Sequence, residues 1–573
     1  MPDRLGAFLS QFFVVNVQSQ PCLFLCAMTE NDEGEAAKVQ VYGSEHWLQW
    51  IENSDKFDDI NLEEVVPNEF EDGCDDADSS VQHIPSAKMK VVKLVAFLDK
   101  MKPACDDVMR STRVHRLLQC FGRVFWAKDH DFFHLSELTK DFDEFVSHSW
   151  HVKAWKKVML LMILKNGMPA VLAGFLAAFL MALLWQLDFL PTYITSANTS
   201  SISCWCLTAG LLMSLVILLF WRAKGSVFLD RVCIHQKDLR RKTEGVMSIG
   251  AILKASHSIL VIFDESYVDR LWCVFELAAF LKAHPDLSGA ESMKVQPVLL
   301  GFASFSVAIT CSLTGFVALF SVKLGLWFSW ILTFGVLGLE GNFLISAFRS
   351  YFRTLEESTH RLSEFQVHKA VCYCCSVNHH DPTTQNEIDV CDREVVQMCV
   401  SSWFGSTTDF EATVRSQVAE ALKHQVGSDA FPYAWILGSS APLMWMLLDL
   451  IASYLKDETL HFMVPFWIIR GFAWWLWGVP TLATIGLFGA RRLRAKGGSL
   501  LAENCRNLLV VVGTLPVVVV LVLWQIVTEV LFHKKDDTLG SLIFAFGVLI
   551  LFLITRLAYR RSIRNKDSKL TTR

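Results

Sequence analysis

The sequence contains little charge, no concentrated basic element and no regular set of paired cysteines. Only 19% of the 573 residues are Asp, Glu, Lys or Arg, and the net charge is −5. The basic residues are dispersed among the ends of expected helices, which argues against nucleic acid as a partner. The 16 cysteines have no framework spacing, so reduced thiols are expected. The apolar run at 9–15 is short and broken, and we predict no signal peptide.

Apolar residues dominate instead. They make up 52% of the chain, including 42 Phe and 19 Trp, and the mean hydropathy is +0.34. Such a composition predicts an integral membrane protein in contact with the lipid bilayer. A membrane-spanning helix needs about 20 apolar residues. Eight stretches qualify, namely 168–187, 204–221, 298–320, 326–348, 434–455, 463–489, 508–532 and 542–557.

The distribution of basic residues in short loops predicts the orientation. Lys and Arg flank the first pair of spans and follow the sixth span, at 491–496, and the eighth. Such loops lie on the cytosolic side. The loop 191–203 has no Lys or Arg and carries Asn198-Thr199-Ser200, an acceptor pattern for N-glycosylation at Asn198. We therefore predict this loop outside and both termini in the cytosol, in the plasma membrane or an endomembrane.

Residues 227–280 have the pattern of a soluble α/β unit between two pairs of hydrophobic segments. A short apolar run precedes Asp230, and apolar residues recur at helical spacing over 246–253. The run 258–263, Ser-Ile-Leu-Val-Ile-Phe, is typical of a buried parallel strand, which is covered on both faces. A second helix is expected from about Val268. Strand, helix, strand and helix in this order predict a parallel layer.

These segments resemble the Toll/interleukin-receptor (TIR) domain, a flavodoxin-like module, in its plant-type form. Plant-type members carry an Ile/Val-rich strand, a Tyr, and Trp-Cys-x-x-Glu-Leu at the start of the next helix. Here these are the strand at 259–263, Tyr267 and the sequence Trp-Cys-Val-Phe-Glu-Leu at 272–277. The fold class implied is a flavodoxin-like cytosolic α/β domain joined to an all-α transmembrane bundle of about eight helices. The order of segments also resembles uncharacterised multispanning algal proteins, which implies no mechanism.

The first strand of the family is expected far away in the sequence. Residues 143–150 fit its pattern, and the resemblance implies a TIR-like domain split by a membrane hairpin; the alternative is an unrelated strand at 145–150. The fourth strand is expected at 295–300. The expected order is an N-terminal cytosolic region 1–140 with an acidic linker at 69–80, the first strand and helix 141–166, a hairpin 167–221, the main TIR-like part 222–297, a hairpin 298–348, a cytosolic Cys/His segment 349–433, four spans 434–557 and a basic tail 558–573.

Glu276 is the candidate catalytic residue. A glutamate at this place is catalytic in TIR domains that hydrolyse NAD, so the resemblance implies NAD as a substrate. It also implies that Ser147, Tyr267 and Trp272 lie near the nucleotide. Because Trp272 and Glu276 are four residues apart, they share a helix face, where a ring can stack nicotinamide and a carboxylate can stabilise positive charge on ribose.

Two observations keep a non-catalytic alternative open. Many TIR domains retain this motif as scaffolds, with the tryptophan in the core and the glutamate as a surface charge. The continuation His-Ser-Trp at 148–150 also departs from the Arg-Gly-Asp-like continuation of plant-type members, which weakens the enzymatic interpretation.

A cysteine and histidine cluster marks the segment 349–433. Thiolate and imidazole are ligands that zinc prefers, although Cys-x-Cys-Cys followed by His-His is no standard finger. The alternative is a loop with reduced structural thiols. The candidate ligands are Cys372, Cys374, Cys375, His379 and Cys391.

Charged residues inside the expected spans are functional candidates by default. Asp449 and Arg470 lie at similar depth in neighbouring spans, so an ion pair is expected. Glu340 has no obvious partner and is the candidate for transport.

The predicted function is signalling or interaction at a membrane, with self-association through the TIR-like surface as the resemblance implies. NAD cleavage is the narrower version of this prediction. The alternative is a channel or transporter with a regulatory TIR-like domain. A transporter of two related halves should show paired spans broken by Gly or Pro, and apart from Pro480 and scattered glycines no such repeat is seen.

Overall fold

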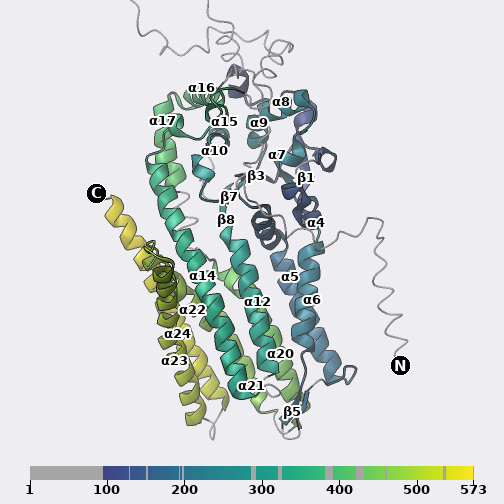
Figure 1. The fold of residues 1–573 in the computed structure, drawn as a ribbon. Coiled ribbons are helices and arrows are strands. Elements are labelled where there is room, and N and C mark those ends of the chain that lie inside the picture. The colour runs from purple at the N-terminus through teal and green to yellow at the C-terminus, as the bar shows by residue number, and fades with distance from the viewer. Residues whose placement is uncertain are drawn as a thin grey trace, which may run out of the picture. The chain divides into compact units, whose positions relative to one another are not determined.

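The computed structural model describes residues 95–571, except for 128–129, 150–151, 193, 197–198, 286–291, 321–324, 381–390, 421–430, 459–460 and 533–536. In this part of the chain, long helices run side by side, and a small mixed sheet lies near one end of α5 and α12 (Figure 1). The predicted acidic linker at 69–80 and the acceptor Asn198 lie outside the described residues.

The sheet has six strands in the order β2-β1-β6-β3-β7-β8. The four at one side are parallel, namely β6 (Ser226–Phe228), β3 (Glu144–His148), β7 (Ile259–Phe263) and β8 (Met293–Pro297). Phe145 pairs with both Phe228 and Ile259, so the strand at 144–148 lies between those of the later unit. Every residue of β3 and β7 is buried. Burial explains the apolar composition of β7, whereas β3 brings the polar residues Glu144, Ser147 and His148 into the interior.

Two short strands extend the sheet in the antiparallel sense, and the sequence pattern did not predict them. They are β1 (Arg110–Arg113) and β2 (Glu137–Leu138). Between them lies α4 (Val114–Trp126), and the same region contains η4 (Asp106–Val108) and η5 (Phe133–Leu135). The helix α4 is interrupted, because Cys120, Phe121 and Gly122 have positive φ angles. Leu117, Leu118 and Val124 are buried, so α4 packs against the protein.

The connection from β3 to β6 leaves the sheet and returns to it. It consists of α5 (Ala154–Gln186), the hairpin β4 (Ile194–Ser196) and β5 (Thr199–Ile202), and α6 (Trp205–Phe220). With 33 residues, α5 is about 50 Å long at 1.5 Å per residue, whereas a bilayer's apolar core is about 30 Å thick. The helix expected after the first strand, within 141–166, and the span expected at 168–187 are one helix.

The other connections within the sheet unit are short helices. They are α7 (Asp230–Cys233), α8 (Leu239–Met247) and α9 (Ile249–Lys254) between β6 and β7, and η6 (Tyr267–Asp269) and α10 (Leu271–Ala283) between β7 and β8. After β8 the chain enters α12 (Leu299–Leu319) almost directly.

Six described helices are long and apolar enough to cross a membrane, so the chain is a multi-pass membrane protein. They are α5, α12, α14 (Leu326–Ser363), the continuous unit of α21 (Met463–Ala473), η10 (Trp474–Gly478) and α22 (Val479–Arg492), α23 (Leu500–Phe532) and α24 (Asp537–Thr571). A seventh span forms if α19 (Tyr433–Ser439) and α20 (Ala441–Lys456), bent by 47°, count as one. The remaining expected span corresponds to α6, which has only 16 residues.

The segment after α14 packs against α10. It contains η7 (Val367–Lys369), α15 (Tyr373–Ser376), α16 (Asp392–Phe404), α17 (Thr407–Thr413) and the π-helix η8 (Val414–Val418). The rings of Phe275 on α10 and Trp403 on α16 stack with centroids 5.3 Å apart. This contact brings a segment distant in sequence to the helix that carries Glu276.

Candidate functional site

Three of the predicted site residues meet at the carboxyl ends of β3 and β7. The Ser147 hydroxyl lies on β3, 2.6 Å from the Tyr267 hydroxyl of η6. The same Ser147 oxygen donates a short hydrogen bond to the Glu276 carboxylate of α10. Ser147 and Tyr267 are buried, and Glu276 is partly buried. The structure therefore joins Ser147 to two residues that follow it by more than a hundred positions, in one polar cluster here called the Ser-Tyr-Glu cluster.

The surroundings of Glu276 disfavour its charged form. Burial raises the pKa of Glu276 from 4.5 to about 8; the Ser147 hydrogen bond and the charge of Arg270 oppose this rise, and the charge of Asp230 adds to it. Burial also raises the pKa of the neighbouring Tyr267 phenol well above its usual range. A carboxyl group with a pKa near neutrality is typical of catalytic acids and bases.

Further ionisable side chains lie at the same edge of the sheet, and the sequence analysis did not identify them as site residues. Asp230 follows β6, and its pKa is raised by burial. His148 ends β3, and burial, followed by the charge of Lys157, lowers its pKa well below the usual value. Asp264 follows β7 directly. Their position at or immediately after the end of a strand is the sequence signal that would have found them.

Trp272 is placed differently from its expected role. Its indole N–H points to the Asp392 carboxylate of α16, 3.5 Å away, and its ring meets Phe275 edge-on at 5.4 Å. Trp272 is thus engaged at the contact between α10 and α16, and it does not belong to the Ser-Tyr-Glu cluster.

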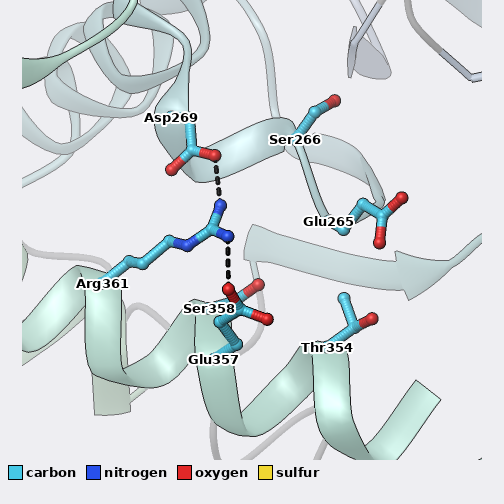
Figure 2. A pocket seen from close by; sticks show the side chains of 7 residues that line it. All are labelled: Glu265, Ser266, Asp269, Thr354, Glu357, Ser358 and Arg361. Carbon is cyan, nitrogen blue, oxygen red and sulfur yellow. Dashed lines mark hydrogen bonds and ion pairs between the residues drawn. The ribbon is translucent and has the colours of Figure 1, made fainter. Parts of the chain in front are cut away.

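A cavity of about 140 Å³ borders this edge of the sheet. Figure 2 shows Arg361 of α14 reaching toward Asp269 and Glu357, with which it forms ion pairs. On the opposite side Ser266 bonds to Ser149, next to the end of β3, with 2.8 Å between their hydroxyl oxygens. The lining residues are Glu265, Ser266, Asp269, Thr354, Glu357, Ser358 and Arg361. Because drug-sized ligands occupy about 300–1,000 Å³, this cavity holds only a small molecule as it stands.

Four of the five predicted metal ligands converge. The Sγ atoms of Cys372, Cys374, Cys375 and Cys391 all lie within 4.8 Å of one another, and this group could hold a metal ion. His379 is not a member of the group, although its backbone N–H bonds to the Cys374 carbonyl at 2.8 Å.

The predicted ion pair between Asp449 and Arg470 is wrong. Asp449 accepts hydrogen bonds from the Ser203 hydroxyl and from two backbone N–H groups at the start of α6. Arg470 instead bonds to side chains and a carbonyl of α23 and α24. The charged side chains of Asp449 and Arg470 thus each form hydrogen bonds with polar groups of other segments, and these bonds take the place of a direct ion pair. Glu340, expected to lack a partner, accepts a hydrogen bond of 2.5 Å from Ser306 of α12.

Comparison with known proteins gave no match to a family model, a curated protein or a solved structure.

Proposed function

We propose that this multi-pass membrane protein carries a cytosolic TIR-like signalling domain that self-associates and cleaves NAD through Glu276. The observation that carries the proposal is the Ser-Tyr-Glu cluster at the carboxyl ends of β3 and β7. A raised carboxyl pKa at a polar cluster supports the proposal, because such shifts gather at functional sites.

The order of the parallel strands supports a flavodoxin-like domain. Numbered along the chain, β3, β6, β7 and β8 are strands one to four, and their order in the sheet is 2-1-3-4. The flavodoxin-like order is 2-1-3-4-5, and ligands bind where it reverses, between strands one and three. Here that point lies between β3 and β7, at the Ser-Tyr-Glu cluster.

The proposed chemistry uses the ionised form of Glu276. In the cleavage, the bond between ribose and nicotinamide breaks and nicotinamide leaves with the bonding electron pair, while water forms the new bond to ribose and releases a proton to solvent. An ionised Glu276 would stabilise the positive charge that develops on ribose, and Ser147 would orient the carboxylate by its hydrogen bond. Entry of a dinucleotide requires the β7–α10 connection to move, because the adjoining cavity is small.

The contacts of α14 support a common side for the sheet unit and the basic loop at 491–496. Arg361 near the end of α14 pairs with Asp269 of η6. Earlier on the same helix, buried Arg349 donates to the Leu493 and Ala495 carbonyls and pairs with Glu503. We place this side in the cytosol, because short basic loops face it.

Replacing Glu276 by glutamine tests the proposal. We expect the full-length protein in detergent to consume NAD, and Glu276→Gln to lower kcat about 100-fold or more, within the range for loss of a group that stabilises charge in the transition state. Glu244→Gln on α8 makes the same chemical change outside the cluster and should keep the activity. No NAD turnover by the wild type, even at high local concentration, or full turnover by Glu276→Gln, would contradict NAD cleavage by this residue.

The raised pKa of Glu276 predicts a pH dependence with a definite sign. If the ionised form is required, kcat/KM rises with pH through about 8. The folded state also binds the extra proton between pH 4.5 and about 8, so the free energy of unfolding falls as pH rises across this window. Glu276→Gln should remove that part of the slope in chemical denaturation. A rate profile that falls between about pH 6 and 9 would contradict the ionised role.

The channel or transporter alternative receives no specific support from the described residues. Glu340, its main candidate, is hydrogen-bonded to Ser306.

A further inference from the structure

We infer that Cys372, Cys374, Cys375 and Cys391 bind one zinc ion, which joins the segment around Val371 to the start of α16 beside the beginning of α10. The inference is independent of NAD cleavage, because it rests on the positions of the thiols and on backbone contacts.

The sulfur geometry fits a single tetrahedral ion. Zinc–sulfur bonds of about 2.3 Å at tetrahedral angles place the sulfurs about 3.8 Å apart. The observed Sγ distances are 3.0 Å for Cys372–Cys374, 3.4 Å for Cys374–Cys391, 3.5 Å for Cys375–Cys391 and 4.0 Å for Cys374–Cys375. The four thiols therefore surround one point.

Two other uses of four cysteines fit less well. A disulfide needs sulfurs about 2.05 Å apart, and Cys374 is close to three partners where a disulfide would join it to one. An iron–sulfur cluster with two irons also takes four cysteines, but ligands on different irons stand farther apart than the 4.8 Å that encloses this group. Four convergent soft ligands favour zinc.

The position of Cys391 favours a bound thiolate. Cys391 is the residue immediately before α16, where the positive end of the helix dipole stabilises negative charge. Cys372 and Cys374 are buried, so the thiols gathered here would otherwise crowd one another without a common partner.

The zinc would connect two segments that both contact α10. Val371 exchanges backbone hydrogen bonds with the entry to α10, from the Leu271 N–H at 3.2 Å and to the Asp269 carbonyl at 2.6 Å. Asp392, next to Cys391, accepts from Trp272 on α10. A bound ion would therefore link the two segments to each other beside α10, the helix that carries Glu276.

Metal content of the purified full-length protein tests the inference. We expect about one zinc per chain by mass spectrometry, as four thiolates fill one structural site, and a loss of most of it in Cys374→Ser and in Cys391→Ser. Cys399→Ser is the matched control, because Cys399 is a buried cysteine of α16 outside the group; His379→Ala should also keep the metal. The inference would be overturned if the wild type contained no zinc or contained iron in its place. It would also be overturned if Cys391→Ser kept its full zinc content.

A second set of measurements uses only the wild-type protein, so it tests the inference even if the cysteine variants fail to fold. Cobalt exchanged into the wild type should give the intense visible and near-ultraviolet absorption of a tetrahedral thiolate site. Removal of the metal from the wild type by a chelator should speed hydrogen exchange of the backbone at the start of α10, while α23 is unaffected. Cobalt spectra without thiolate bands would contradict the metal site. Unchanged hydrogen exchange at α10 would contradict its role in stabilising the start of that helix.

Discussion

Gly301→Ala is expected to destabilise the protein by about 3 kcal/mol, at the upper end of the usual cost of overpacking. Gly301 lies in the first turn of α12, where α12 meets α5. A methyl group there would overlap the Leu160 nitrogen and stand 2.5 Å from the Leu160 Cα and 2.7 Å from the Met159 carbonyl carbon. These are backbone atoms of a helix, so they cannot rotate away as a side chain could.

Helix propensity alone would predict that Gly301→Ala stabilises the protein, so a loss of stability would show the steric overlap. Alanine in a helix is favoured over glycine by about 1 kcal/mol. Gly338→Ala on α14 is the matched control, because among the described residues no atom beyond its chain neighbours and the backbone of its own helix lies within 4 Å of the position its methyl group would take. Thermal unfolding in detergent should show a lower Tm for Gly301→Ala and an equal or higher Tm for Gly338→Ala. An unchanged Tm for Gly301→Ala would mean that α5 and α12 do not approach as closely as described.

The second large effect is expected from Asp449→Asn. The two oxygens of this fully buried carboxylate accept from the Ser203 hydroxyl at 2.8 Å, the Cys206 N–H at 3.0 Å and the Leu207 N–H at 2.9 Å. Asp449 thus satisfies the first N–H groups of α6 from another helix, a task that a capping residue usually performs. An asparagine keeps the shape but turns an N–H₂ group toward these donors.

We expect Asp449→Asn to cost about 2–4 kcal/mol, because hydrogen bonds to a charged group contribute about 1.5–3 kcal/mol each and buried donors lose their partner. Glu529→Gln makes the same chemical change on α23, where the carboxylate has no hydrogen bond or ion pair to a described residue. Its Tm should stay within about a degree or two of the wild type, as is usual for a substitution that breaks no contact. Equal behaviour of the two variants would show that Asp449 does not cap α6.

Two strands of the sheet continue into membrane helices, so a movement of these helices could be passed to the sheet during the proposed signalling. β3 leads into α5, and β8 leads into α12 across Val298 alone. A tilt of α5 against α12 would therefore move the strands on either side of β7. The α5 backbone lies close against Gly301 of α12, so this contact restricts such a movement.

Local patterns in the sequence were sufficient for the long helices and for β7, although not for β1 and β2. The apolar runs predicted the long helices, and the continuous run at 259–263 predicted β7, because a segment surrounded by lipid or by protein is apolar along its whole length. The motif at 272–277 predicted a helix with Glu276 on it, and the cysteine spacing at 372–375 indicated a ligand cluster. The pattern at 145–150 also indicated a strand, although not the strands that would flank it.

The tertiary structure decided the direct contacts between distant groups. Ser147 donates directly to Glu276, where the resemblance implied only that both lie near one ligand, and the cysteine cluster forms without His379. Asp449 bonds to α6 in place of Arg470. A buried polar group needs a partner, but its own surroundings in the sequence do not say which returning segment supplies it. The position of β3 between β6 and β7 has the same origin, since pairing of strands is set by the whole path of the chain. The sequence determined which residues must be buried or paired, and only the fold determined with what.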